Sequence, residues 1–148
     1  MKLLAHMDDP RRPDIAQFEL EEWIDSSPFE KLLGLRIESS ADGEAVLTMP
    51  FTVKLANGGG VMHGGAMTSL ADTAVAMAIK SLLPSGTTFA TTGLTMEFLA
   101  PVISGVVCAY ARVKKTGERS FEGACELRGE DQLIYARFTS VFKVARKQ

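Results

Sequence analysis

One segment of the chain is long and apolar along one face, and it constrains the fold more than any other feature. The segment covers residues 66–83, and Pro84 and Gly86 mark its end. Its apolar spacing predicts a helix about 27 Å long. The residues that recur at helical spacing and form its apolar stripe are Met67, Leu70, Ala71, Ala74 and Ala78. A stripe of this kind has to be buried against another element, and most of the other predicted elements are strands.

The pattern of apolar residues changes to a period of two after this helix. Such alternation is typical of β-strands, and short turns at 115–117 and 129–131 separate some of them. The predicted strands lie within residues 35–39, 44–51, 94–98, 102–114, 121–127 and 134–142. Because the connections are mostly of hairpin length, we expect an antiparallel sheet in an α+β fold, wrapped around the one long helix.

The N-terminal part of the chain predicts little regular structure. Residues 1–14 mix charge with proline and predict a loose leader. The apolar positions of residues 15–24, which include Trp23, predict a short amphipathic helix before Pro28. The length of 148 residues is typical of one domain, so residues 15–148 are expected to form a single unit.

Composition and charge exclude several classes of protein. A net charge of −2 argues against nucleic acid as a partner. No run approaches the roughly 20 apolar residues of a membrane-spanning helix, and the start of the chain lacks the apolar core of a signal peptide. We therefore expect a cytoplasmic protein. Cys108 and Cys125 lie in apolar runs and are interpreted as core thiols.

Asp72 is the residue of the long helix that most needs an explanation. On a helical wheel it falls beside Val75 and Ile79, away from the polar arc that contains Thr73. No lysine or arginine stands three or four residues from it. A half-buried carboxylate without a cation is typical of a catalytic group, although a differently rotated helix would make Asp72 an ordinary exposed residue.

A glycine-rich loop, residues 55–65, precedes the helix. Its last residues, His63, Gly64 and Gly65, stand where helix-terminal amides lack internal partners and can stabilise an anion. A phosphate cradle is the alternative, but the loop has neither of the common phosphate-binding patterns. With His6 the only other histidine, His63 is interpreted as structural or substrate-orienting rather than metal-binding. Asn57 is interpreted on its own as a turn residue.

These motifs together resemble the hotdog-fold thioesterases of the phenylacetate-degradation, or PaaI-like, branch. The resemblance rests on Asn57, on His63-Gly64-Gly65 six residues later, and on Leu70-Ala71-Asp72, and it extends over residues 33–144, including the segment 94–101. It implies that a long helix is enclosed by a curved antiparallel sheet, that the protein is an acyl-CoA thioesterase, and that no metal or cofactor is needed.

The resemblance also implies roles for individual residues. Asp72 is expected to act as nucleophile or as general base, and the Gly64 amide to polarise the thioester carbonyl. Asn57, His63 and Thr91 are expected to help position the reacting groups. The site is expected to lie between two subunits, so that Asp72 faces the loop of its dimer mate, and dimers are expected to pair into tetramers.

Substrate contacts are expected from four further residues: Gly65, Thr92, Lys115 and Arg119. The basic turn around Lys115 and Arg119 resembles the region where related enzymes hold the CoA nucleotide, although a charged hairpin tip is often simply solvated. The sequence does not distinguish between a small aromatic and a medium-chain acyl group as the substrate. A non-catalytic acyl-CoA binding protein is the alternative function, whereas a hydratase is disfavoured because the sequence lacks the aspartate–histidine pair of such sites.

Overall fold

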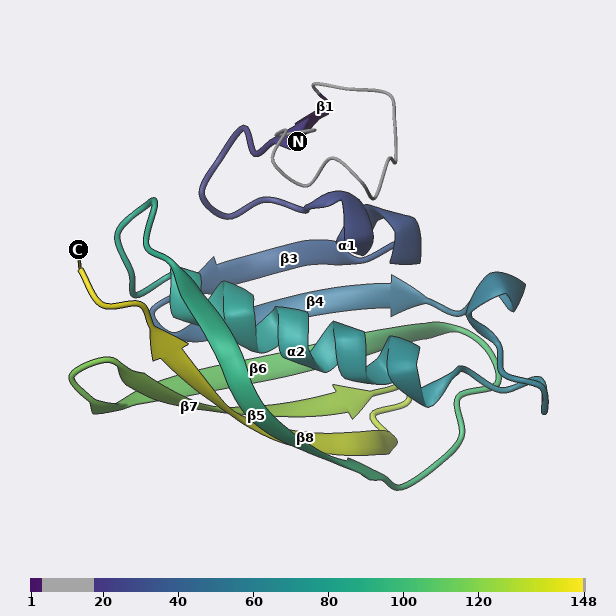
Figure 1. The fold of residues 1–148 in the computed structure, drawn as a ribbon. Coiled ribbons are helices and arrows are strands. Elements are labelled where there is room, and N and C mark those ends of the chain that lie inside the picture. Colours follow the sequence, from purple (N-terminus) through teal and green to yellow (C-terminus); the bar gives the residue numbers. More distant parts are fainter. Residues whose placement is uncertain (4–17, 148) are drawn as a thin grey trace.

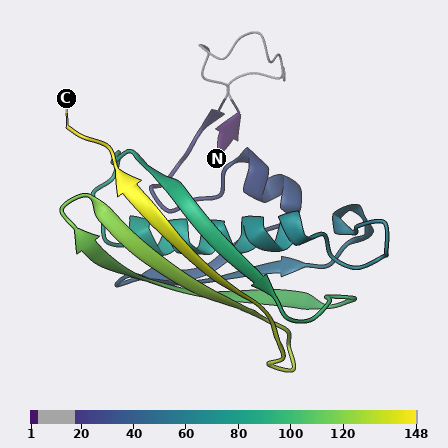
Figure 2. The ribbon, with the colours of Figure 1, turned by 60° about the horizontal axis from the view of Figure 1, so that its bottom comes forward.

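The computed structural model describes residues 1–3 and 18–147, in which one long helix lies against one six-stranded sheet (Figure 1). The helix is α2 (Gly64–Lys80). The sheet has the strand order β3-β4-β6-β7-β8-β5, and all its neighbours are antiparallel. Its strands are β3 (Arg36–Ala41), β4 (Glu44–Pro50), β5 (Phe89–Phe98), β6 (Val106–Gly117), β7 (Ser120–Arg128) and β8 (Ile134–Val144). The sheet curves around the helix (Figure 2), which confirms the predicted α+β hotdog fold.

The core lies between α2 and the inner face of the sheet. Alternate residues of β4 are buried there, as the pattern predicted, and so is the alanine-rich stripe of α2. Gly123 in β7 lies directly against the helix, since an added Cβ there would lie 2.2 Å from Cγ1 of Val75. Glycine at this position therefore lets the helix rest directly on the sheet.

The ends of the predicted elements agree with the structure to within a few residues. The hairpin β3–β4 turns at Asp42 and Gly43, which both have positive φ, 53° and 80°. This combination is that of a type I′ turn, which suits the twist of antiparallel strands. Helix α2 begins two residues before the predicted start because His63 caps it, and the chain continues past Lys80 as turns.

The predicted helix over residues 15–24 is wrong where the structure describes it. β2 (Phe18–Glu19) instead pairs with β1 (Lys2–Leu3), and residues 21–24 form bends. The apolar spacing has another cause: Trp23 packs against the far end of α2 rather than along a helix of its own. Residues 4–14 of the predicted leader lie outside the described residues. A short helix, α1 (Pro28–Leu33), begins with Ser27 and Glu30 as a capping box.

Strand β5 is an edge of the sheet, and α2 covers only part of its inner face. Leu94 and Phe98 point to the same side as the buried residues of β8 with which they pair, yet they are 46% and 54% exposed. A 3-10 turn (Val53–Leu55) and the glycine loop lie near the same end of the sheet as Phe98. Within the described residues no helix is long and apolar enough to cross a membrane.

Candidate active site

Asp72 lies half-buried in the middle of α2, on the flank that faces β5. Its neighbours on the helix, Ala71, Ala74 and Val75, are fully buried. In the part of the chain that the structure describes, no cation approaches the carboxylate within salt-bridge distance. The position deduced from the helical wheel, on the edge of the apolar stripe, is therefore the position that Asp72 occupies.

Thr91 is the partner of Asp72. It stands on β5, where its Oγ1 donates a 2.8 Å hydrogen bond to Oδ1 of Asp72. A bulge follows between Thr91 and Gly93, so that Thr91 faces α2 while Gly93 faces outward. The other carboxylate oxygen, Oδ2, accepts no hydrogen bond from any described residue and is free for a substrate or a water molecule.

The surroundings of Asp72 act on its acidity in two directions. Burial raises the pKa of the carboxyl above its usual value because it disfavours the charged form. The hydrogen bond from Thr91 lowers the pKa and offsets part of this effect. A base with a raised pKa accepts a proton from water more readily, while the Thr91 hydrogen bond favours the ionised form in which Asp72 can act.

Asn57 forms the corner of the glycine loop. Its Oδ1 accepts hydrogen bonds from the backbone N–H of Gly59 at 2.8 Å and of Val61 at 3.4 Å. Gly60 has a φ of 82°, which requires glycine, and its N–H donates to the Asn57 carbonyl. The side chain thus builds the loop, as the interpretation from the residue alone proposed, and among the described residues its amide nitrogen has no acceptor.

His63 caps the beginning of α2. Its Nδ1 accepts the N–H of Gly65 at 2.8 Å, and its carbonyl accepts the N–H groups of Ala66 and Met67. Accepting at Nδ1 places the proton of the neutral ring on Nε2, which lies on an exposed side chain and can donate outward. The Gly65 amide is therefore occupied within the chain.

The Gly64 amide is the free donor of this turn. Gly64 is the first residue of α2, so its N–H has no partner inside the helix, and no other described residue accepts it. An added Cβ at Gly64 would lie 3.0 Å from Cζ of Phe98. Sequence reasoning assigned no role to Phe98, although the alternation of Leu94, Met96 and Phe98 indicates that they share a face.

A pocket of about 360 Å³ adjoins the Gly64 amide. Apart from Asn57 and Gly64 its lining is apolar, from Val61, Met62, Met67, Phe98, Leu99, Ala100 and Pro101. Asp72 does not line it. Asp72 follows Gly64 by eight positions of the helix, which corresponds to about 12 Å along the axis. One chain therefore carries the amide with its pocket and the carboxylate with Thr91 at separate places.

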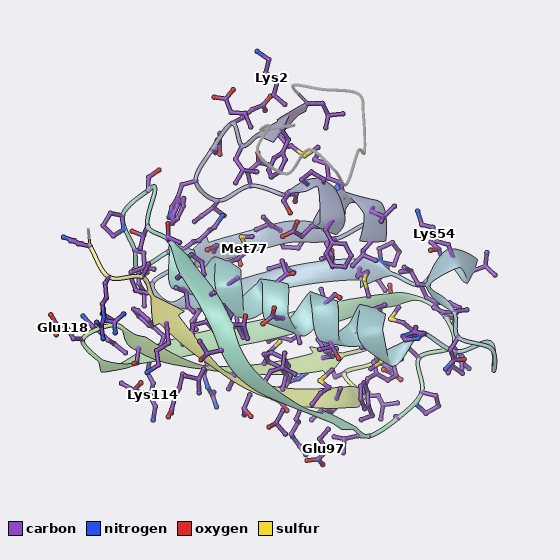
Figure 3. The ribbon with its side chains drawn as sticks, viewed as in Figure 1. Lys2, Lys54, Met77, Glu97, Lys114 and Glu118 are labelled. Atoms are coloured by element: carbon purple, nitrogen blue, oxygen red, sulfur yellow. The ribbon has the colours of Figure 1, made fainter. Side chains whose placement is uncertain are left out.

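The remaining predicted contacts lie apart from Asp72. Thr92 is exposed, and its hydroxyl donates to the carbonyl of Val141. Arg119 donates to the carbonyl of Val144 and lines a hollow of about 660 Å³, whose other cations are Arg146 and Lys147. Lys115 is exposed on the same β6–β7 hairpin, whose residues Lys114 and Glu118 are labelled in Figure 3.

Residues that could hold a metal are not clustered in the described part of the chain, where no three His, Cys, Asp or Glu side chains converge. Cys125 is buried and its pKa is raised to about 12 by burial, so this thiol is inert at neutral pH. Cys108 is half-buried on the outer face of β6, and both cysteines are free.

Comparisons with known proteins agree with this geometry. A family model described as thioesterase superfamily matches residues 59–136. The chain is 36% identical over 109 residues to the acyl-coenzyme A thioesterase PaaI of Escherichia coli, covering 73% of this chain and 76% of that protein. It is 34% identical to a putative esterase of Halobacterium salinarum, covering 70% of this chain and 72% of that protein.

Solved structures extend the similarity to the whole fold. A conserved protein of Pseudomonas aeruginosa superposes with a TM-score of 0.79 and 32% identity, covering 84% of this chain and 98% of that chain. The PaaI protein from the phenylacetic acid degradation operon of E. coli superposes with a TM-score of 0.75 and 32% identity, covering 82% of this chain and 87% of that chain.

Proposed function

Because this chain belongs to the thioesterase superfamily and is a thioester hydrolase, we propose that its substrates are acyl-CoA esters of small aromatic or medium-chain acids. The observation that carries the proposal is the half-buried Asp72 carboxylate, which has one hydrogen-bond donor on Oδ1 and a free Oδ2. A carboxylate held in this way can remove a proton from an attacking water or attack the thioester carbonyl itself.

The reaction needs a donor for the oxyanion as well as a base. When a water oxygen attacks the carbonyl carbon, its proton passes to Asp72 and negative charge develops on the carbonyl oxygen. We assign the stabilisation of this charge to the free N–H of Gly64, helped by the positive end of α2. The C–S bond then breaks, and the thiolate of CoA takes up the proton. In the alternative route a carboxylate oxygen of Asp72 attacks the carbonyl carbon, the C–S bond breaks and CoA leaves as the thiolate, and water then hydrolyses the resulting anhydride to the free acid and the Asp72 carboxylate.

The separation within one chain supports a site shared between two subunits. The Gly64 amide and Asp72 stand about 12 Å apart along α2, too far to act on one carbonyl. Strand β5 has a free edge, and its exposed inner residues Leu94 and Phe98 form an apolar surface for a second copy. We propose a homodimer as the minimal active unit, in which Asp72 faces Gly64 of the partner subunit, and a tetramer as the complete assembly.

The pocket beside Gly64 supports a small acyl group. Its volume of about 360 Å³ is near the lower end for ligand sites. An apolar cavity of about 150 Å³ already holds benzene, so this pocket accommodates one ring with a linker, or a short chain. Met62 and Met67 in its lining are flexible enough to adapt to either shape.

The basic hollow at the β6–β7 hairpin supports a nucleotide-bearing thioester. Arg119, Arg146 and Lys147 line it together with a single acid, Glu118, and exposed Lys115 stands on the same hairpin. In a protein of net charge −2, this local excess of cations attracts anions such as the phosphates of CoA. We assign Lys115 and Arg119 to this role, and Thr92 and Gly65 to substrate contacts made after assembly.

The test is hydrolysis of a panel of aromatic and medium-chain acyl-CoA esters, followed by trapping of the released thiol. Asp72→Asn is expected to lower kcat at least about 100-fold, because it removes the base while it keeps the shape of the side chain. Asp42→Asn is the matched control, since Asp42 lies in an exposed turn whose positive φ asparagine also tolerates. Unchanged turnover in Asp72→Asn, or binding of CoA esters without thiol release by the wild type, contradicts the proposal.

A further inference from the structure

Trp23 joins the N-terminal segment to the C-terminal end of α2 by two reciprocal hydrogen bonds. Its indole Nε1 donates to the backbone carbonyl of Lys80 at 2.9 Å, and Nζ of Lys80 donates to the backbone carbonyl of Trp23 at 2.9 Å. The same ammonium group lies 4.7 Å from the centre of the Trp23 ring. The indole therefore hydrogen-bonds the carbonyl of the last helical residue, which also accepts the N–H of Leu83.

The other side of Trp23 contacts the beginning of β5. Its ring meets Phe89 edge to face at 6.5 Å between centroids, and Phe89 meets Phe142 at 5.9 Å. Phe142 is buried in β8 directly opposite Thr91, and Phe89 shares the inner face of β5 with Thr91 two residues on. A continuous row of rings thus leads from Trp23 to the strand position of Thr91.

Helix α2 and strand β5 are joined at few other places. At the opposite end of the helix, Gly64 lies against the ring of Phe98. Between these two ends the hydrogen bond from Thr91 to Asp72 spans the space, and the inner residue Leu94 stays exposed rather than packing under the helix. The pairing of β5 with β8 and the packing of Met96 against the core also hold the strand, so the contacts at the two ends set the distance between Asp72 and Thr91 together with these.

We propose that Trp23 is a positioning residue, which clamps the end of α2 to the beginning of β5 and so holds Thr91 within hydrogen-bond distance of Asp72. The inference rests on the proposed catalytic role of Asp72. A contribution of Trp23 to stability alone is the competing explanation, and the two differ in one respect. A clamp acts through the Thr91 hydrogen bond, so the effects of changing Trp23 and Thr91 on turnover are coupled rather than additive.

The experiment is a double-mutant cycle with Trp23→Ala and Thr91→Val, in which kcat and KM are measured on the acyl-CoA that the wild type hydrolyses fastest. Trp23→Ala is expected to lower kcat about tenfold, since a displacement of the reacting groups by a fraction of an ångström has effects of this size. KM is expected to stay within about twofold. Thr91→Val is expected to lower kcat in the wild-type background and to have almost no further effect in Trp23→Ala.

Two milder variants keep the inference testable if Trp23→Ala does not fold. Lys80→Met keeps the aliphatic stem but removes the ammonium group above Trp23, and it is expected to show the same coupling on a smaller scale. Trp23→Phe keeps a ring against Phe89 and is expected to recover part of kcat. Phe29→Ala is the matched control, because Phe29 is an exposed aromatic residue of α1 outside the row of rings.

The outcomes separate this inference from the proposed function. Additive effects of Trp23→Ala and Thr91→Val, or a kcat per folded molecule that equals the wild type, overturn the clamp even if Asp72→Asn is inactive. Full activity of Asp72→Asn overturns the proposed function itself, and the clamp with it. Coupled effects combined with an inactive Asp72→Asn support both.

Discussion

The Thr91 hydroxyl is the only described group that donates a hydrogen bond to the Asp72 carboxylate, and it offsets part of the effect of burial on that group. Burial favours the neutral carboxylic acid, whereas the proposed reaction requires the ionised form. The local arrangement is therefore a balance between two opposing influences. The helical wheel indicated the buried flank, but the identity of the donor depends on a strand 19 residues away and could not be read from helical spacing.

The pH dependence of turnover is a direct consequence of this balance. Asp72 must be ionised, so kcat/KM is expected to fall as the pH drops through its raised pKa. Thr91→Val removes a hydrogen bond that stabilises the charged form; the pKa of Asp72 rises further and the acidic limb moves to higher pH. At higher pH, where Asp72 is ionised in both proteins, the variant is expected to retain about a tenth of wild-type activity, because the carboxylate has lost the hydrogen bond that positions it.

The measurement is a set of pH profiles of kcat/KM for the wild type, Thr91→Val and Thr95→Val. Thr95 stands on the same strand, but it points to the outer face and its side chain is exposed, so its profile is expected to match the wild type. An acidic limb that moves to lower pH in Thr91→Val would contradict the assigned direction of the hydrogen bond.

The loop residues show why side-chain roles were harder to predict than element positions. Asn57 and His63 were expected to orient the substrate, and in the structure both also hydrogen-bond the backbone of their own loop. A short polar side chain beside glycines readily accepts hydrogen bonds from nearby backbone N–H groups. In such sequences a structural role within the loop is therefore the main alternative to a role in orienting the substrate. Any contact with substrate uses the remaining donors, the Asn57 amide nitrogen and the Nε2–H of His63.

At the scale of elements, the long helix and all six strands of the main sheet were predictable because their apolar periods are regular. The segment before Pro28 was not, since five large apolar side chains in ten residues fit a helix but also fit an extended chain that packs on the body of the protein. In the structure Trp23 donates a hydrogen bond to the carbonyl of Lys80 at the end of α2. That partner lies 57 residues away and leaves no local signal.

The close contact between α2 and β7 can be tested with a single substitution. An added Cβ at Gly123 would lie 2.2 Å from Cγ1 of Val75, which is fully buried and cannot move aside. Gly123→Ala is therefore expected to lower the free energy of unfolding by about 1–3 kcal/mol, the usual cost of overpacking a core. Urea denaturation followed by circular dichroism measures the change.

The control for this prediction is a compensating change at the same contact. Val75→Ala alone leaves a small cavity and is expected to be destabilising. In the double variant the methyl group that Gly123→Ala adds occupies part of that cavity, so the combined loss is expected to be smaller than the sum of the two single losses. Additive losses would show that the helix and β7 do not meet at this point in solution.

At the scale of the whole molecule, the chain carries the proposed site as two separate halves. One half is Asp72 with Thr91 in the middle of α2, and the other is the Gly64 amide with the small apolar pocket near the beginning of the same helix. The sequence revealed both halves as motifs. The Gly64 amide and Asp72 are too far apart along α2 to act on the same carbonyl, so within one chain they belong to different reaction centres. This spacing supports an active unit of at least two subunits.

Mixing two inactive variants tests this arrangement. Asp72→Asn removes the base, and Gly64→Pro removes the free N–H with little harm to the helix. Proline is favoured at the first helical position, and His63 already has the extended backbone that a residue before proline requires. Each variant alone is expected to lose at least about 100-fold in kcat. Gly64→Ala is the control, because it adds the same Cβ beside Phe98 but keeps the N–H.

The two variants are refolded together from denaturant in equal amounts, and thioester hydrolysis is measured against each variant refolded alone. If one site takes Asp72 from one subunit and the Gly64 amide from the other, a mixed dimer contains one site with both changes and one intact site. Random pairing makes half of the dimers mixed, so about a quarter of wild-type activity is expected to return. If both groups acted within one chain, every site would carry one of the two changes, and the mixture would stay as inactive as its components.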